Sequence, residues 1–219
     1  MLRHIVVVMG MIAAAVSAPA IGAPLPTALR KVAVPADLQI AGWNHMLGRL
    51  REKLPMYRVC RDNPRRCPNE QIAAWQAFLL RLRSATPVQK LDAINRFANK
   101  VSYARDNAKS ADSWATPDES LEGGADCEDY TILKYFSLRE LGFAAKQMRI
   151  TVMAATERIP AHAILAVDIG GLTFYADNLD SELSTSFKYD DQALLYYINE
   201  QESRMYVTPG SIVVTANGS

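Results

Sequence analysis

The sequence predicts an α+β fold, in which helices come first along the chain and an antiparallel sheet follows. Two patterns favour it: apolar residues recur with helical spacing in three segments between residues 69 and 142, and they alternate with a period of two in segments after residue 147. The chain has 219 residues, enough for one sizeable globular domain and marginal for two. Its formal net charge of +1 shows no basic excess, so we expect no nucleic-acid partner.

The first two predicted helices cover residues 69–84 and 88–101, and Thr86-Pro87 separates them. A third helix begins after Gly123-Gly124 and ends at Gly142, a residue that favours helix C-termini. Cys127 falls in the first turn of this third helix. Between residues 102 and 122 the periodicity disappears, which predicts a long loop, and loops of that length in compact domains are often functional.

Strands are predicted in the second half of the chain from the alternating pattern. They cover residues 148–154, 161–168 and 172–177, and a terminal pair is expected around residues 205–215. Residues 24–36 contain three prolines among small residues, and we expect an extended lead-in there rather than a packed element.

The first 23 residues have the pattern of a secretory signal peptide. Arg3 and His4 precede an apolar run over residues 5–16, and small residues follow up to Pro24. We expect cleavage after Ala20 or Ala23, which leaves a single domain over residues 24–219 of an exported protein. An uncleaved membrane anchor is the alternative, and the apolar run is short for a membrane span.

Export allows the three cysteines to pair, because disulfides persist in oxidising compartments. Cys60 and Cys67 enclose Asp-Asn-Pro, a turn sequence that brings the two ends together, so a local disulfide is expected. Zinc is the weaker alternative, since the spacing is unusual and no histidine lies nearby. The pairing leaves Cys127 as an odd thiol, which is either buried and inert or reactive.

A contact between a histidine and an aspartate is predicted in the sheet. Gly170-Gly171 is a hairpin turn signal, and the register around it places Ile164 opposite Asp177. His162 points to the same face as Ile164 and is therefore a diagonal neighbour of Asp177, roughly 7–8 Å away, a gap that two side chains can close. A lone histidine on a strand is usually structural, but His162 is the only histidine in the sheet half of the chain.

Cys127 is placed as a nucleophile would be, because a helix N-terminus and a nearby imidazolium both favour the thiolate. It needs a base, and His162 is the best available. The neighbouring carboxylates of Asp126, Glu128 and Asp129 oppose ionisation of the thiol. They either complement the helix dipole, with Asp126 as N-cap, or bind a hard cation such as Ca²⁺, and both can hold at once.

Four separate blocks of the chain resemble the bacterial transglutaminase-like cysteine peptidases. They occur in matching order within a region from about Trp75 to Asn199. The blocks are Ser113-Trp114-Ala115-Thr116-Pro117, Asp126-Cys127-Glu128-Asp129-Tyr130, Ala161-His162-Ala163 and Tyr175-Ala176-Asp177-Asn178.

This resemblance implies a papain/transglutaminase-like fold and a catalytic triad of Cys127, His162 and Asp177, with Asp126 and Glu128 as calcium ligands. The best-known member of the family is a periplasmic, calcium-dependent protease that cleaves a very large surface adhesin and so releases biofilm cells. The resemblance therefore implies a periplasmic location and a protein substrate such as a large adhesin. It also implies regulation by an inner-membrane receptor that responds to cyclic di-GMP.

Two other classes of protein share these features. A transglutaminase or deamidase uses the same triad on a glutamine side chain, and the triad alone does not separate it from a peptidase. A non-catalytic calcium-binding adaptor domain keeps the fold without the triad, and the intact Cys127, His162 and Asp177 argue against it. Trp114 is expected either to line the substrate groove or to anchor packing.

Overall fold

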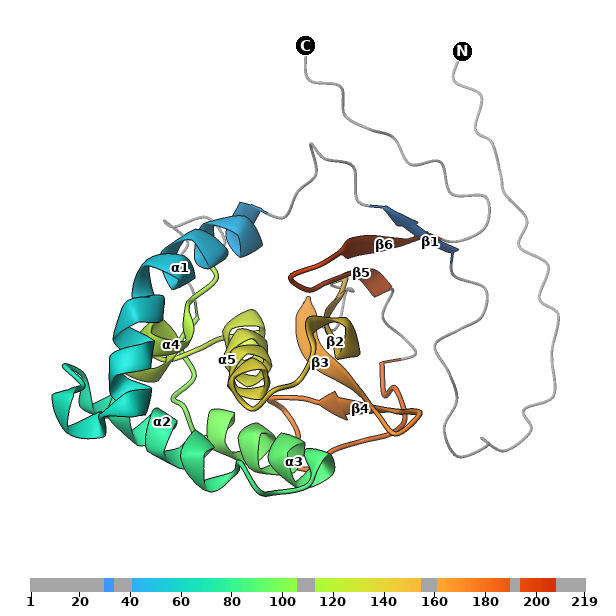
Figure 1. Cartoon of the computed structure of the whole chain (residues 1–219). Coiled ribbons are helices and arrows are strands. Elements are labelled where there is room, and N and C mark those ends of the chain that lie inside the picture. The colour runs from blue at the N-terminus through green and yellow to red at the C-terminus, as the bar shows by residue number, and fades with distance from the viewer. Residues whose placement is uncertain (1–29, 34–40, 106–112, 155–160, 190–193, 208–219) are drawn as a thin grey trace, which may run out of the picture.

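The computed structural model describes residues 30–33, 41–105, 113–154, 161–189 and 194–207, so the predicted signal peptide lies outside the described residues. Helices gather on one side of an antiparallel sheet, and α5 lies between the sheet and the outer helices (Figure 1). Helices come first along the chain and most of the sheet follows. The predicted α+β class is therefore confirmed.

The helices begin where the sequence supplies capping residues. Asn69 accepts a hydrogen bond from the Ile72 N–H at 2.9 Å, and Thr86 and Gln89 form a capping box, as expected for the predicted helix starts. The helices are α1 (Ala41–Asp62), α2 (Glu70–Arg81), α3 (Pro87–Ala98), α4 (Pro117–Gly123) and α5 (Cys127–Glu140), with short 3₁₀ turns at Pro64–Arg66 and Ala145–Gln147.

Two helices were not anticipated. The predicted loop over residues 102–122 is wrong at its end, because α4 begins at Pro117, a favoured first helical residue, and continues to Gly123. Helix α1 contains Pro55, which usually interrupts a helix, but it buries Trp43, Met46, Leu50 and Tyr57 along one side. Packing of that apolar side stabilises α1 despite the proline.

The described strands form one six-stranded sheet in the order β1-β6-β5-β2-β3-β4, with every neighbouring pair antiparallel. The strands are β1 (Arg30–Ala33), β2 (Met148–Met153), β3 (His162–Ile169), β4 (Leu172–Ala176), β5 (Leu194–Ile198) and β6 (Ser203–Val207). The predictions for β2, β3 and β4 are confirmed to within about a residue.

The sequence-based expectations for the two chain ends need correction. A strand does cross Met205, but its partners are β5 and β1 rather than a segment near residue 215, and residues 208–219 lie outside the described residues. The lead-in over residues 24–36 likewise contains β1, which is paired with β6.

Strand β5 was not predicted from the sequence. It reads Leu-Leu-Tyr-Tyr-Ile, a continuous apolar run without the alternation of apolar and polar residues that identifies a half-buried strand.

The hairpin between β3 and β4 has the predicted register. The pairs run from Ile169–Leu172 next to the turn to Leu165–Ala176 at the far end. Gly170 and Gly171 have φ angles of 61° and 82°, the positive values that a tight hairpin turn of this type requires. Asp177 follows the last pair directly, one step beyond the end of the ladder.

Helix α5 is the centre of the hydrophobic core. Every residue from Asp129 to Leu138 is buried, so α5 is enclosed on all sides. A second, smaller cluster on the other face of the sheet includes Ile164, Ala166 and Tyr175. The described helices include none that is both long and apolar enough to cross a bilayer.

The predicted disulfide is present between Cys60, near the end of α1, and Cys67, just before α2. Because the two sulfurs are bonded to each other, the alternative prediction that these cysteines bind zinc is wrong. Within the described residues Cys127 is the free cysteine.

Candidate active site

Cys127 is the first residue of α5, and its position is fixed by the residues around it. Asp126 precedes the helix as N-cap, and the carboxylate of Asp129 accepts hydrogen bonds from the backbone N–H groups of Ala115 at 2.6 Å and Asp126 at 3.4 Å. Gly124 has a φ of 96°, and a Cβ there would lie 2.8 Å from the Ser102 carbonyl oxygen. Only glycine therefore allows the chain to approach this closely before Cys127.

The start of α5 meets the backbone of strand β3 at Ala163, next to His162. The Thr131 hydroxyl lies 2.8 Å from the carbonyl oxygen of Cys127 and 3.3 Å from that of Ala163. A backbone hydrogen bond from Ala163 also acts on the Cys127 thiol, where it lowers the pKa. Because β4 ends opposite Leu165, the first turn of α5 contacts the part of β3 that β4 does not cover.

His162 and Asp177 are in direct contact. His162 Nε2 lies 2.9 Å from Asp177 Oδ1, and both side chains are buried. This is the diagonal contact expected from the register of the β3–β4 hairpin.

Two further donors hold the carboxylate of Asp177. The backbone N–H of Leu179 donates to Oδ1 at 3.0 Å, and the Tyr189 hydroxyl donates to Oδ2. Burial alone raises the pKa of Asp177, but the hydrogen bonds from His162, Leu179 and Tyr189 outweigh it and the pKa falls below its usual value. The ring of Tyr189 also packs against that of His162, with centroids 5.4 Å apart.

Cys127 and His162 line the same pocket, which has a volume of about 500 Å³. Trp114, Asp126 and Glu128 also line it, so the pocket adjoins both the nucleophile candidate and the acidic pair. Trp114 is 3% exposed and packs edge-on against Trp43, with ring centroids 6.2 Å apart. It therefore serves both of the roles considered from the sequence, packing anchor and pocket wall.

The thiol of Cys127 faces an acidic neighbour. Its Sγ lies 3.0 Å from Glu128 Oε2, a contact in which the thiol donates. Burial raises the pKa of the Cys127 thiol, and the negative charges of Glu128 and Asp126 raise it further. The opposition that the sequence predicted between these acids and a thiolate is present in the structure.

The carboxylates of Asp126 and Glu128 form a pair that fits a cation. Burial, together with the charge and hydrogen-bond contact of Asp126, raises the pKa of Glu128 to about 8. Two carboxylates at such short range are stabilised either by a shared proton or by a hard cation. The described residues contain no group of three or more acidic, histidine or cysteine side chains suited to a metal, so further ligands to a cation would be oxygen atoms of other kinds.

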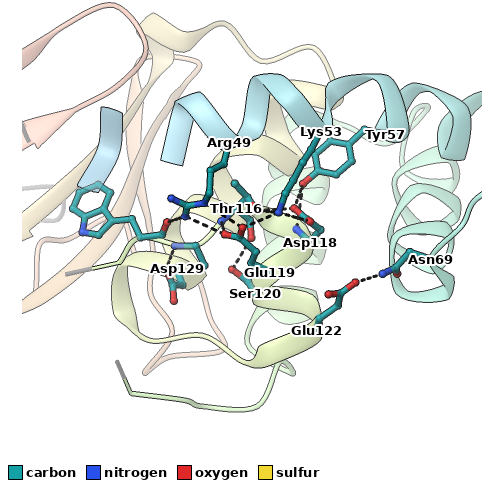
Figure 2. A network of polar contacts seen from close by, with 12 residues as sticks. Arg49, Lys53, Tyr57, Asn69, Thr116, Asp118, Glu119, Ser120, Glu122 and Asp129 are labelled. Atoms are coloured by element: carbon teal, nitrogen blue, oxygen red, sulfur yellow. Dashed lines mark hydrogen bonds and ion pairs between the residues drawn. The ribbon is translucent and has the colours of Figure 1, made fainter. Parts of the chain in front are cut away.

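A network from α1 fixes the segment that precedes α5 (Figure 2). Arg49 donates to the Trp114 carbonyl oxygen at 2.6 Å and pairs with Glu119 at 3.0 Å. Lys53 lies 2.6 Å from Asp118 and 2.7 Å from Glu119. These contacts hold the backbone of Trp114 at the edge of the pocket.

The sequence model described as bacterial transglutaminase-like cysteine proteinase matches residues 50–206. The match covers most of the chain and every residue of the candidate site. The chain therefore belongs to this family and is a cysteine peptidase, a hydrolase. No curated protein sequence matches it.

Solved structures of LapG from Legionella pneumophila share the fold. The calcium-bound structure has 27% sequence identity and a TM-score of 0.56, over 67% of this chain and 84% of that chain. A second LapG structure has 25% identity and a TM-score of 0.57, over 69% and 86% of the two chains. An EGTA-treated form has 25% identity and a TM-score of 0.57, over 69% and 83%. The transglutaminase-like fold expected from the sequence is thus confirmed.

The five residues proposed from the sequence come together in two groups. Cys127 and His162 share the pocket with Asp126 and Glu128, and Asp177 lies behind His162. Sequence reasoning missed Tyr189, which is twelve residues beyond Asp177 and donates a hydrogen bond to its carboxylate.

Proposed function

We propose that this protein is an exported cysteine endopeptidase in which Cys127 is the nucleophile, His162 the general base and Asp177 the acid that orients the base. The contact between His162 Nε2 and Asp177 Oδ1, with Cys127 in the same pocket, carries the proposal. Since Nε2 faces the acid, Nδ1 is the ring nitrogen left to accept the thiol proton. An acid that fixes the tautomer in this way is the arrangement of Cys–His–acid sites.

The reaction is acyl transfer to water. The thiolate attacks a peptide carbonyl, and the backbone N–H of Cys127, which begins α5 and has no acceptor within the helix, is available to stabilise the oxyanion. The imidazolium of His162 then protonates the leaving amine. Water hydrolyses the resulting thioester, with His162 again acting as base, and releases the acid product.

Calcium fits the acidic pair beside the thiol. Asp126 and Glu128 are the residues that would hold the ion, and its positive charge would favour the thiolate and relieve the repulsion between the two carboxylates. The raised pKa of Glu128, which is caused first by burial and then by the neighbouring Asp126 carboxylate, supports this assignment. Calcium-bound LapG is a relative with the same fold.

A protein substrate suits the surroundings of the pocket. Apolar side chains that are unusually exposed line its rim, among them Tyr103, Leu179 and Leu195, and they offer contacts to side chains of an extended polypeptide. The resemblance to the adhesin-releasing proteases points to a periplasmic or cell-surface protein such as a large biofilm adhesin. It also points to an inner-membrane receptor controlled by cyclic di-GMP as regulator.

The proposal includes a periplasmic location, based on the predicted signal peptide over residues 1–23 and on a mature domain over residues 24–219. Cell fractionation with an antibody to the protein tests this directly. A periplasmic protein whose N-terminal sequence begins after Ala20 or Ala23 is the expected result.

The central experiment incubates the purified protein with N-terminal fragments of large exported adhesins from the same cells, with Ca²⁺ and with EGTA. Cleavage by the wild type in Ca²⁺, with loss in EGTA and in Cys127→Ala, is expected. Cleavage that persists in Cys127→Ala would contradict the triad assignment. Cleavage that is unaffected by EGTA would contradict only the calcium requirement. Incorporation of a fluorescent amine into glutamine residues without chain cleavage would instead identify a transglutaminase.

A further inference from the structure

Leu179 is a strongly exposed apolar residue at the edge of the active-site pocket. Its relative exposure is 74%, the highest among the large hydrophobic residues that the structure describes. It lines the pocket together with Cys127 and His162. A single exposed leucine is common on protein surfaces and needs no explanation. The position of Leu179 next to the candidate catalytic residues is what distinguishes it from such a leucine.

The backbone of Leu179 lies beside the imidazole of His162. The Leu179 N–H donates to Asp177 Oδ1 at 3.0 Å, and His162 Nε2 lies 2.9 Å from the same oxygen atom. Two groups that contact one oxygen atom are neighbours. Leu179 therefore borders the pocket on the side of His162, whereas Cys127 borders it on the side of α5.

The turn that carries Leu179 is anchored on both sides. Asn99 Nδ2 of α3 donates to the Asp177 carbonyl oxygen at 2.8 Å and to the Asp180 carbonyl oxygen at 3.1 Å. Asn95 Nδ2 of the same helix also donates to the Asp180 carbonyl oxygen, at 3.1 Å. Because the backbone before and after Leu179 is bonded to a helix, its side chain is held at a fixed place on the rim of the pocket.

The chemistry of peptide cleavage places one half of the substrate next to His162. The thiolate adds to the carbonyl carbon and forms a C–S bond. When the C–N bond then breaks, its electron pair goes to the nitrogen, which takes the proton of the imidazolium. A general acid must lie within hydrogen-bond reach of the atom that it protonates. The substrate residue that follows the cleaved bond is therefore held beside His162, where Leu179 is the exposed apolar neighbour.

We propose that Leu179 is a specificity-determining residue, which contacts the side chain of the substrate residue directly after the cleaved bond and selects an apolar side chain there. The proposal rests on the peptidase activity proposed above, and it specifies which part of the protein substrate this edge of the pocket recognises. Contact between two apolar side chains removes surface of both from water, which favours an apolar over a polar residue by roughly three- to tenfold.

Cleavage of a peptide mixture measures this preference without a known substrate. The purified protein in Ca²⁺ is incubated with peptides derived from a whole proteome, and mass spectrometry identifies the residues on both sides of each cleaved bond. The wild type should favour apolar residues directly after the bond. Leu179→Asn should lose that preference, and Leu179→Met should retain it. The preference for the residue before the bond should be the same in all three proteins.

Leu172→Asn is the matched control. Leu172 is another exposed leucine, with a relative exposure of 56% at the start of β4, and it does not line the active-site pocket. Its replacement should leave the residue preference unchanged, and neither asparagine variant should lower the melting temperature, because both positions are exposed. An unchanged preference in Leu179→Asn, an equal change in Leu172→Asn, or a change only before the cleaved bond would each contradict the role of Leu179.

A binding measurement in Cys127→Ala separates failure of this proposal from failure of the proposed function. The peptides Leu-Gly-Gly amide and Asn-Gly-Gly amide represent the half of a substrate that departs after cleavage, so neither has to be cleaved. In NMR titrations Leu-Gly-Gly amide should bind more tightly, by a factor similar to that given above, and should shift the backbone signal of Leu179. With Leu179→Asn added, the two peptides should bind equally.

The outcomes of the two experiments point to different conclusions. Absence of cleavage by the wild type contradicts the proposed function, and the titration then decides the role of Leu179 by itself. Equal affinities of the two peptides for Cys127→Ala, or an unshifted Leu179 signal, contradict the role of Leu179 even if peptides are cleaved. A wild-type dimer that dissociates in Leu179→Asn, measured by analytical ultracentrifugation, would assign this leucine to contact between two copies of the chain and overturn the proposal.

Discussion

The carboxylate of Asp177 has a different partner on each oxygen. Oδ1 accepts from His162 and from the Leu179 backbone, while Oδ2 accepts from the Tyr189 hydroxyl. A carboxylate held on both oxygens can neither rotate freely nor pick up a proton easily. Tyr189 therefore contributes to the orientation of His162 through the acid, in addition to its ring contact with the imidazole.

Tyr189→Phe removes the hydroxyl and keeps the ring. Hydrogen bonds to charged groups contribute about 1.5–3 kcal/mol, so we expect kcat/KM at neutral pH to fall by roughly ten- to a hundredfold, with a smaller change in KM. Steady-state kinetics on a cleavable adhesin fragment measure this. Tyr175→Phe is the matched control, because Tyr175 packs in the same cluster without a contact to Asp177, and an equal loss there would argue against a specific role of Tyr189.

Asp177 also makes stability depend on pH. Its pKa is lower in the folded protein than in the unfolded chain, where it is about 3.9, so the folded state binds fewer protons in that range. The stabilisation by Asp177 is fully present above about pH 4 and is lost as the pH falls through the pKa that Asp177 has in the folded protein. Asp177→Asn should therefore lower the melting temperature at pH 7, and the gap to wild type should narrow in acid; a gap that stays constant between pH 7 and pH 3 contradicts this.

The His162–Asp177 contact could be predicted because a short hairpin fixes the register of its two strands. The turn at Gly170-Gly171 fixes which residues of the two strands face each other, and the alternation of side chains fixes the face of the sheet to which each one points. Tyr189 follows no such rule. It lies beyond an irregular segment, so its position depends on tertiary packing that the sequence pattern does not encode.

Among the elements, α1 acts on the site from a distance. Its basic side chains bind α4 and the Trp114 carbonyl, so α1 holds the segment between residues 114 and 124 that leads into α5 (Figure 2). Burial opposes ionisation of Glu119, but its contacts with Arg49 and Lys53 lower its pKa to about 2. The network thus depends on Glu119 being charged.

Glu119→Gln tests the network. The unfolded glutamate has a pKa of about 4.3, so the stabilisation by Glu119 is complete above that pH and disappears as pH falls toward about 2. We expect a lower melting temperature than wild type at pH 7 and a shrinking difference between pH 4 and pH 2, measured by circular dichroism. Glu52→Gln is the control, since Glu52 is an exposed glutamate on α1, the helix that carries Arg49 and Lys53. A pH-independent loss of stability in Glu119→Gln would point to packing instead.

The elements that the sequence predicted are those with a regular spacing of apolar residues and with recognisable capping or turn residues at their ends. Helices α2 and α3 have Asn69 and Thr86 as caps, and β3 and β4 share a glycine turn. The elements that it missed lack such signals. Helix α1 contains Pro55, α4 is only seven residues long, and β1 is stabilised by pairing with β6, a partner more than 160 residues away in sequence.

At the scale of the whole molecule, α5 organises the fold. It is enclosed by the sheet and the outer helices, and it carries Cys127 at its first residue. A nucleophile at the start of a helix buried on all sides is held rigidly, which suits the preorganisation that acyl transfer needs. The family model matches residues 50–206, which include every residue of the candidate site, and the LapG structures share the fold.

The disulfide between Cys60 and Cys67 supports the outer helical layer without contributing to the pocket, because neither residue lines it. A loop this short constrains the unfolded chain modestly, so we expect Cys60→Ser/Cys67→Ser to lower the free energy of unfolding by about 2 kcal/mol, measured by urea titration. Peptidase activity at 25 °C should persist, since the substitutions leave the proposed triad unchanged.

Alkylation of the free thiols tests whether the disulfide is present. The unfolded wild type, alkylated without reductant, should gain one label by intact mass, and Cys127→Ser should gain none, because the remaining two sulfurs are bonded to each other. Three labels in the wild type would mean that the disulfide does not form in the isolated protein. Loss of activity in Cys60→Ser/Cys67→Ser at a temperature where it remains folded would mean that the outer helices transmit strain to Cys127, most directly through the contacts of Arg49 with Glu119 and Trp114.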